Sequence, residues 1–161
     1  MYRLSSFGDF KCKHCGTFVS SAHLLSGVNN RNHCPYCLWS CHLDLYASGD
    51  RLSACKGTMK PIGLTMKKSR NKYRTESHGE LMPIHQCVDC AALSMNRIAA
   101  DDDAEFVLTV FQESLAFHYQ LILLCQPHDI TPLHAGDIES VKAQLYGRSA
   151  ERSSAIWEVI Q

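Results

Sequence analysis

Apolar and polar positions change their pattern near residue 100 of the 161-residue chain. Before it, short runs with strand propensity occupy residues 17–20, 59–66 and 81–85, and Gly, Pro and Asn turns separate them. None of these strands is long enough to form a core by itself. The segment 67–80 is polar and basic, which predicts an exposed loop joining two strands of a long hairpin.

After residue 100 the apolar residues recur at helical spacing. The positions that share one face of a predicted helix are Val107, Phe111, Leu115, Ile122 and Cys125. The acidic run 101–103 suits the N-terminus of this helix, and Gln126-Pro127 predicts its end. The runs FVLTVF and LILLC also have strand propensity, and we favour the helix. A second helix is predicted from residues 136–137 to Gly147, and residues 151–161 extend it or fray.

Charge follows the same division. Lys and Arg number 16 in the whole chain, as do Asp and Glu, yet residues 1–100 carry a net charge of +7 and residues 101–161 carry −7. A basic part joined to an acidic part indicates a polyanionic partner, or docking of one part on the other. We therefore divide the chain into a cysteine-rich domain, 1–100, and an acidic helical region, 101–161.

The nine cysteines favour metal binding. The N-terminal residues have no apolar core of the signal-peptide type, and no run of about 18 apolar residues occurs in the chain. We therefore expect a cytoplasmic protein with no membrane partner. In a reducing compartment, thiols in Cys-x-x-Cys pairs are better explained as zinc ligands than as disulfides.

The first predicted zinc site consists of four thiolates. Cys12-x-x-Cys15 and Cys34-x-x-Cys37 are separated by 18 residues, a spacing typical of a Cys₄ zinc ribbon. Each pair forms a tight turn whose two sulfur atoms point at one ion. The alternative, that these are buried free thiols, is weaker because the motif occurs twice at a zinc spacing.

A second site is built around another Cys-x-x-Cys pair, which needs two partners. The candidates are Cys41, His42, Cys55, His85, Cys87 and Cys90. Cys55 precedes a glycine and a strand, as at the exit of a zinc ribbon, and is the third ligand. For the fourth we place His42 ahead of His85. Cys41 ranks below both, because adjacent side chains rarely reach the same point.

Two sites with four protein ligands each have no open position for water or substrate. Such zinc ions are structural, and each contributes folding free energy of about 10 kcal/mol in a small domain. The predicted fold is therefore a small α+β protein, with tandem zinc ribbons of short antiparallel hairpins followed by a helical part. Because both metal sites are filled by protein ligands, we favour a binding protein over an enzyme.

Residues 9–100 resemble the RNHCP domain family, which is named for the stretch Arg31-Asn32-His33-Cys34-Pro35. The resemblance rests on FKCKHCG, RNHCPYCLWSCHLD, GDRLSACKGTMKPIG, His85-x-Cys87-x-x-Cys90 and NRIAADD, and DIESVKAQLYG is similar to longer members. It implies a small cysteine-rich, metal-binding domain. The resemblance implies no settled molecular function.

Several other residues can touch a ligand or only shape the fold. Arg31 either grips phosphate or a base edge, or fixes the turn through a salt bridge. We expect His33 to act as an outer partner of the zinc thiolates rather than as a base, and Asn32 to form a turn. We expect Trp39 to cap the small core rather than stack on bases, and His118 to be a satisfied core or boundary histidine.

Three functions compete. In the first, a basic face binds RNA, such as that of the ribosome, through Arg31, Lys56, Lys60, Lys67, Lys68, Arg70, Lys72 and Arg74. In the second, the zinc part is a scaffold and the C-terminal helices bind a partner protein. The third and weakest is a treble-clef-like, metal-dependent nuclease with His33 as its base, which would need a further cluster of ligands around a divalent ion.

Overall fold

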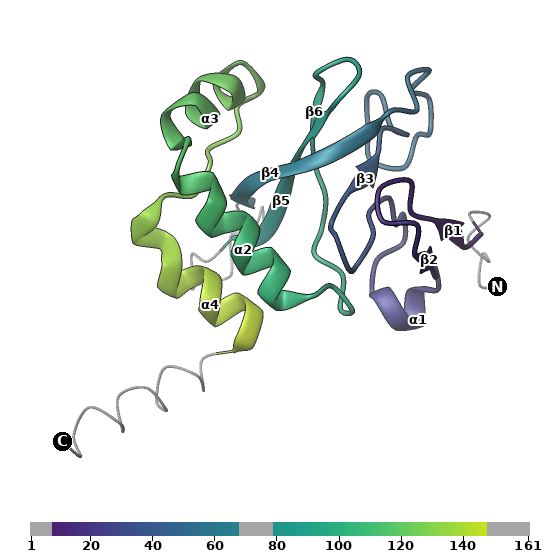
Figure 1. Cartoon of the computed structure of the whole chain (residues 1–161), viewed down its shortest axis with the longest axis horizontal. Coiled ribbons are helices and arrows are strands. Elements are labelled where there is room, and N and C mark those ends of the chain that lie inside the picture. Colours follow the sequence, from purple (N-terminus) through teal and green to yellow (C-terminus); the bar gives the residue numbers. More distant parts are fainter. Residues whose placement is uncertain (1–7, 68–78, 148–161) are drawn as a thin grey trace, which may run out of the picture.

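The computed structural model describes residues 8–67 and 79–147. Its strands form two antiparallel sheets (Figure 1). In the smaller sheet β1 (Phe10–Lys11) pairs with β2 (Phe18–Val19). The larger sheet has the order β3-β4-β5-β6, and its strands are β3 (Ser40–Cys41), β4 (Thr58–Lys67), β5 (Glu80–Cys87) and β6 (Leu93–Met95). The predicted small α+β class with antiparallel sheets is confirmed.

The long hairpin of β4 and β5 is the centre of the molecule. Met59 lies opposite Cys87 at one end, and Lys67 lies opposite Glu80 at the other. Both strands extend the predicted runs by a few residues, and the middle of each is buried. Most of the predicted basic loop, residues 68–78, lies outside the described residues.

The helices follow the hairpin in the chain, except for a short first one. They are α1 (His23–Ser26), α2 (Ala104–Leu115), α3 (His118–Cys125) and α4 (Ile138–Tyr146), with short 3₁₀ turns η1 (Gln126–His128) and η2 (Ala135–Asp137). Asp103 caps α2 as its charge predicts, accepting a hydrogen bond from the Phe106 amide at 3.1 Å. Gly147 ends α4 at the predicted position. The predicted extension over residues 151–161 lies outside the described residues.

The single helix predicted across residues 104–125 is wrong, because the chain bends by 95° between α2 and α3. The bend lies over Gly63 of β4. A methyl group added there would meet Leu121 Cδ2 at 2.7 Å and Ser114 Cβ at 3.5 Å, so both helices approach this strand closely. The bend turns Leu121 and Cys125 onto the sheet, where a straight helix would carry them past it.

Two clusters of buried side chains join the helices to the hairpin. The larger one contains Leu38, Leu64, Leu81, Val107, Val110, Phe111, Leu133 and Val141, from β4, β5, α2, α4, the turn that precedes β3 and the segment between η1 and η2. The smaller one contains Ile62, Ile84, Leu121, Cys125 and Ile130. The helices therefore share their core with the strands on which the cysteine-rich part is built.

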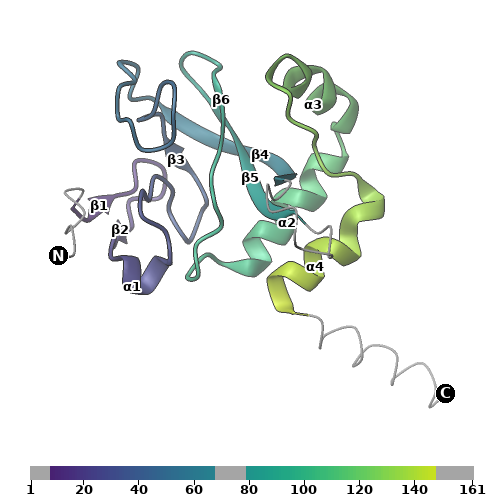
Figure 2. The same cartoon turned by 180° about the vertical axis from the view of Figure 1, so that it is seen from behind.

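Both cartoon views place α2, α3 and α4 on one side of the hairpin and β1, β2 and α1 on the other (Figures 1 and 2). The outward side of α3 is apolar, with Tyr119, Ile122 and Leu123 exposed. This is the exposed surface that the adaptor hypothesis requires, and its partner stays a prediction.

Among the described residues, no single helix combines the length and apolar character needed to cross a membrane. Residues 104–115 and 118–128 meet that test only as a pair, across the 95° bend.

Two leucines of α3 test this packing. Leu121 is 1 % exposed and Leu123 is 51 % exposed. We expect Leu121→Ala to lower the free energy of unfolding by about 3 to 5 kcal/mol, because the cavity left behind adds to the lost burial. Leu123→Ala is the matched control and changes it by about 0.5 kcal/mol or less. Urea unfolding of the metal-loaded protein measures both, and equal losses would contradict this packing of α3.

Candidate metal centres

The three Cys-x-x-Cys turns share one backbone geometry. In each, the amide of the residue four positions after the first cysteine donates to that cysteine's carbonyl, at 2.9 Å for Gly16 and Leu38 and 3.0 Å for Ala91. These residues have positive φ angles of 75°, 57° and 62°. Glycine adopts this conformation without strain, whereas leucine and alanine do not. The chain therefore accepts strain at two of the three turns that present its sulfur atoms.

The first cluster contains Cys12, Cys15, Cys34 and Cys37, whose sulfur atoms all lie within 4.8 Å of one another. The shortest separations join Cys12 to Cys37 at 3.6 Å and Cys15 to Cys34 at 3.7 Å. A tetrahedral ion with metal–sulfur bonds of about 2.3 Å separates its ligands by about 3.8 Å. These distances fit a shared ion, and they are far too long for disulfide bonds.

Three thiols of this cluster have pKa values that are shifted in different directions. Hydrogen bonds from the side chain and backbone of Thr17 lower the pKa of Cys15 to about 6. Burial raises the pKa of Cys34 and Cys37 above the ordinary value. Buried thiolates need a cation beside them, because a medium of low polarity disfavours the charged form. A divalent ion bound by all four sulfur atoms would supply it.

The second cluster contains His42, Cys55, Cys87 and Cys90, and its ligand atoms also lie within 4.8 Å of one another. Cys55 Sγ is 3.6 Å from Cys87 Sγ, and Cys90 Sγ is 3.3 Å from His42 Nδ1. Gly57 makes room for this arrangement, because a methyl group there would lie 2.9 Å from Cys87 Sγ and 2.2 Å from Asp89 Oδ2. The donor set, three sulfurs and one imidazole nitrogen, is one that zinc ribbons use.

The structure places His42, not its rival His85, beside these three cysteines. His85 is fully buried in the sheet, and Leu38 O lies 2.7 Å from its Nε2 while Asn96 Nδ2 lies 3.2 Å from its Nδ1. The carbonyl accepts from Nε2–H, and Nδ1 accepts from the amide, so both ring nitrogens are occupied. Burial, helped by the charge of His33, lowers the pKa of His85 to about 3, so this histidine is neutral.

Each cluster offers four protein donors, which complete a tetrahedron and leave no position for water. Cys41 and Cys125 belong to neither cluster. Within residues 8–67 and 79–147 the clusters are the two groups of three or more His, Cys, Asp or Glu side chains close enough to hold an ion. The nuclease hypothesis therefore has no separate metal cluster in the described part of the chain.

Arg31 is a structural residue rather than an exposed contact. Its side chain is 0 % exposed and forms ion pairs with Asp101 at 2.8 Å and Asp102 at 3.3 Å. The guanidinium also donates to the carbonyls of His33 and Ser20. The salt bridge weighed against a nucleic-acid contact is what the structure contains, and the contact itself stays a prediction.

His33 contacts a carboxylate and not the thiolates. Its Nε2 lies 2.8 Å and 2.9 Å from the two oxygens of Asp102, to which it donates. The Asp102 side chain is 0 % exposed and also accepts from the Ala99 amide at 2.8 Å. The predicted role of His33 beside the zinc is therefore corrected. Arg31, His33 and Asp102 form a buried ion cluster that joins the turn before Cys34 to the start of α2.

The side chain of Asn32 forms hydrogen bonds with the loop that follows His42, not within its own turn. Its amide donates to Asp44 at 3.0 Å, and its oxygen accepts from Arg51, which is in turn paired with Asp44. Asp50 organises the same loop by accepting backbone amides from residues 45–47 and 52, and these bonds lower its pKa below the usual range. Asn32 and the side chains of Asp44, Asp50 and Arg51 thus organise the loop between His42 and Cys55.

The surroundings of the aromatic residues and of His118 agree only in part with those expected from the sequence. Trp39 packs against the first cluster, and its ring stacks on His14 at a centroid distance of 4.0 Å and an angle of 4°. Tyr36 is 59 % exposed. His118 is half-buried, but its Nδ1 atom is buried without a hydrogen-bond partner among the described residues, so the expectation of a satisfied histidine is wrong for this atom.

The remaining basic residues divide by position. Lys56, Lys60 and Lys67 are exposed. Lys68, Arg70, Lys72 and Arg74 lie outside the described residues. Sequence reasoning did not assign Asp101 and Asp102 as the partners of Arg31, which lies about 70 residues before them in the chain.

Comparison with known proteins gives one match, to a family model. A family model described as RNHCP domain matches residues 7–108, which is more than half of the 161 residues and includes every ligand of both clusters. No curated protein and no solved structure matches the chain.

Removal of a single ligand should remove a single metal ion. Cys90 belongs to the second cluster, whereas Cys41 belongs to neither. We expect native mass spectrometry to find two ions per chain in the unaltered protein and in Cys41→Ser, and one in Cys90→Ser, because three ligands bind a structural ion much more weakly than four. Equal metal content in the two variants would contradict the second site.

The buried ion cluster makes a separate prediction. Asp102→Asn leaves the charge of Arg31 buried with only one carboxylate partner, so we expect the free energy of unfolding to fall by about 3 to 5 kcal/mol. Asp103→Asn, one residue away, is the control. It should change stability by about 0.5 kcal/mol or less, because asparagine caps a helix as well as aspartate does. Urea unfolding at fixed metal content measures both. A loss of stability in Asp103→Asn as large as that in Asp102→Asn would contradict the stabilising role of the buried ion cluster.

Proposed function

The chain belongs to the RNHCP domain family, and on this premise we propose that it is a structural-zinc module that binds RNA through unpaired lysines of its cysteine-rich part. The proposal has two steps. The first assigns zinc to the two clusters, and the second infers an RNA partner from the exposed lysines.

Zinc suits both donor sets better than magnesium or calcium does. Four thiolates, or three thiolates and an imidazole, are soft ligands in a tetrahedral arrangement, which magnesium and calcium avoid and zinc favours. With all four positions filled by the protein, the ion contributes to folding and offers no site for a substrate. The proposed zinc ions therefore hold the ribbons, and recognition falls to the surface around them.

One observation carries the RNA proposal. In the described part of the cysteine-rich region every arginine is ion-paired: Arg31 with Asp101 and Asp102, Arg51 with Asp44, and Arg97 with Glu80. Every lysine there is exposed and, within the described residues, has no carboxylate within salt-bridge distance: Lys11, Lys13, Lys56, Lys60 and Lys67. The arginines serve the fold, and the lysines remain available for phosphates.

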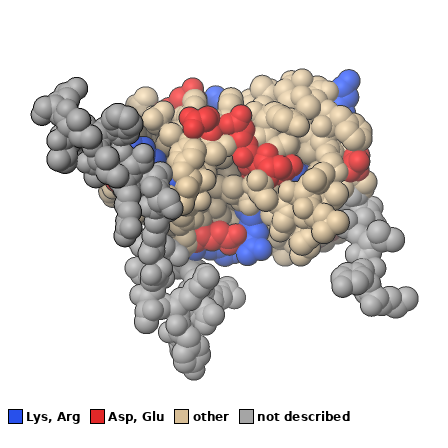
Figure 3. Space-filling model, turned by 90° about the horizontal axis from the view of Figure 1, so that it is seen from below, with Lys and Arg blue, Asp and Glu red and all other residues tan. Residues whose placement is uncertain are grey.

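The distribution of acidic residues supports the same partner. Three acidic residues precede α2, and the face drawn in Figure 3 carries several groups of carboxylates across its middle, with most of the visible lysines and arginines toward its edges. A polyanion would be repelled from such a face. It would approach the cysteine-rich part, where the unpaired lysines lie.

Secondary structure favours RNA over double-stranded DNA. Within the described residues the cysteine-rich part has one helix of four residues, α1, which is too short to read a major groove. Its lysines lie on strands and loops, which suit single-stranded and looped RNA such as that of the ribosome. The proposed site of action is the cytoplasm.

A titration of single-stranded RNA by fluorescence anisotropy, at several salt concentrations, tests this function. We expect affinity to fall with salt by about 0.7 log units per phosphate contact and per tenfold rise in salt. Replacing Lys56 and Lys67 together by Gln should lower that slope by about 1.4. Lys142→Gln, a lysine of α4 paired with Glu139, is the control and should leave the slope unchanged. Binding that does not respond to salt would contradict the proposal.

A further inference from the structure

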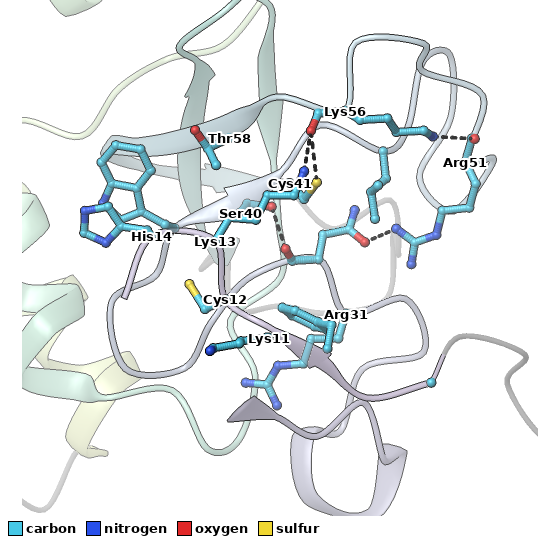
Figure 4. Close-up of a pocket in the computed structure, with 15 residues that line it drawn as sticks. Lys11, Cys12, Lys13, His14, Arg31, Ser40, Cys41, Arg51, Lys56 and Thr58 are labelled. Carbon is cyan, nitrogen blue, oxygen red and sulfur yellow. Dashed lines mark hydrogen bonds between the residues drawn. The ribbon is translucent and has the colours of Figure 1, made fainter. Parts of the chain in front are cut away.

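A pocket of about 470 Å³ lies beside both metal clusters (Figure 4). It is lined by Cys12 of the first cluster and by Cys41 and Lys56, the neighbours of His42 and Cys55 in the second. Its volume lies in the range of sites that bind small molecules. Neither metal site uses this pocket to complete its ligands, so the pocket is available to bind a separate ligand.

The charged residues that line the pocket are all basic. They are Lys11, Lys13, Arg31, Arg51 and Lys56, and no aspartate or glutamate lines it. The two arginines are occupied by Asp101, Asp102 and Asp44, which lie outside the lining. The three exposed lysines therefore decide which ligand charge the pocket accepts, and they favour an anion.

The zinc–thiolate centres proposed above are themselves negative, with a formal charge of about −2 for four thiolates and about −1 for three. The lysines offset part of this charge. Their hydrogen bonds point elsewhere, since Lys13 Nζ donates to Lys56 O at 2.9 Å and Lys56 Nζ donates to Arg51 O at 3.1 Å. An ammonium group has three donors, so each of these lysines keeps two for a ligand.

The uncharged lining residues include aromatic and apolar side chains. His14, labelled in Figure 4, stacks on Trp39, and Phe10 and Leu43 add apolar surface, while Asn32, Ser40 and Thr58 are polar. A planar ring packs well against such side chains, and a purely inorganic anion would leave them without a partner. The lining therefore fits a ligand that joins a flat ring to a negative charge.

We propose that this pocket binds one nucleotide, with the base against the aromatic side and the phosphate on the lysine ammonium groups. The inference rests on the proposed RNA-binding function, of which it names the site. The same chemistry is offered by a free mononucleotide and by an unstacked nucleotide within single-stranded RNA. Duplex RNA keeps its bases stacked and does not enter.

Cys41 is a probe of the pocket already present in the chain. Its sulfur lines the pocket at intermediate exposure and lies 3.6 Å from Lys56 O. The remaining cysteine outside the clusters, Cys125, is fully buried. In the metal-loaded protein, N-ethylmaleimide should therefore label Cys41 first, and peptide mass spectrometry measures the rate.

The experiment measures this labelling with uridine monophosphate, with a single-stranded uridine octanucleotide, and with an RNA duplex. At a ligand concentration of about ten times Kd, about one pocket in ten remains free, so labelling should slow about tenfold. We expect this protection from the octanucleotide or the mononucleotide, and none from the duplex. Conversely, protein labelled beforehand should lose binding to the protecting ligand. Cys41→Ser treated with the same reagent should keep that binding, which controls for labelling elsewhere.

A pair of variants separates the pocket from the surrounding charge. Lys11→Gln with Lys13→Gln should remove the protection while both metal ions are retained. Lys60→Gln, which replaces an exposed lysine that does not line the pocket, should keep it. Loss of protection in both would show general charge attraction and overturn the nucleotide site.

The outcomes distinguish the two proposals. Salt-sensitive RNA binding without protection of Cys41 would overturn the pocket and leave the RNA-binding function standing. Protection by the mononucleotide with no binding of RNA would support the pocket and overturn that function. Protection by the octanucleotide alone would place the nucleotide within an RNA strand. Neither binding nor protection would overturn both.

Discussion

Seven sulfur atoms and one imidazole nitrogen lie in two groups of four, with the donors of each group within 4.8 Å of one another. At such distances thiolates repel each other strongly unless a cation lies between them. The smaller sheet consists of strands of two residues, and the first cluster has Val19, Phe10 and Trp39 as its apolar neighbours. The turns of the first cluster therefore have little apolar surface to hold them in place, and a bound cation would supply the free energy that is missing.

The stretch 31–35, for which the family is named, anchors the turn that carries part of the first cluster. Arg31 and His33 meet Asp102, about 70 residues further along the chain, in a cluster from which water is excluded. Leu38, inside the same turn region, belongs to the core shared by the β4–β5 hairpin and the helices α2 and α4. The first metal cluster is thereby joined to the hairpin, and the second takes Cys87 from the end of β5. The same framework carries the lysines that line the pocket beside the clusters.

Spacing along the sequence was informative wherever the relevant partners were local. The three Cys-x-x-Cys turns, the central hairpin and the ends of the helical part follow from motif spacing and turn residues. The bend after Leu115 did not, because it depends on the close approach to Gly63 on a distant strand. The partners of Arg31 and His33 were missed for the same reason. Neither helical periodicity nor cysteine spacing reports on a carboxylate so far along the chain.

X-ray absorption at the zinc edge of the purified protein tests the central claim most directly, because it reports the atoms bound to the metal. Clusters of four sulfurs, and of three sulfurs with one nitrogen, give an average of about 3.5 sulfur ligands at about 2.3 Å and about 0.5 nitrogen at about 2.0 Å per zinc. This is the result that two closed structural sites predict. A shell with one or more oxygen ligands per zinc, or with two or fewer sulfurs, would contradict it.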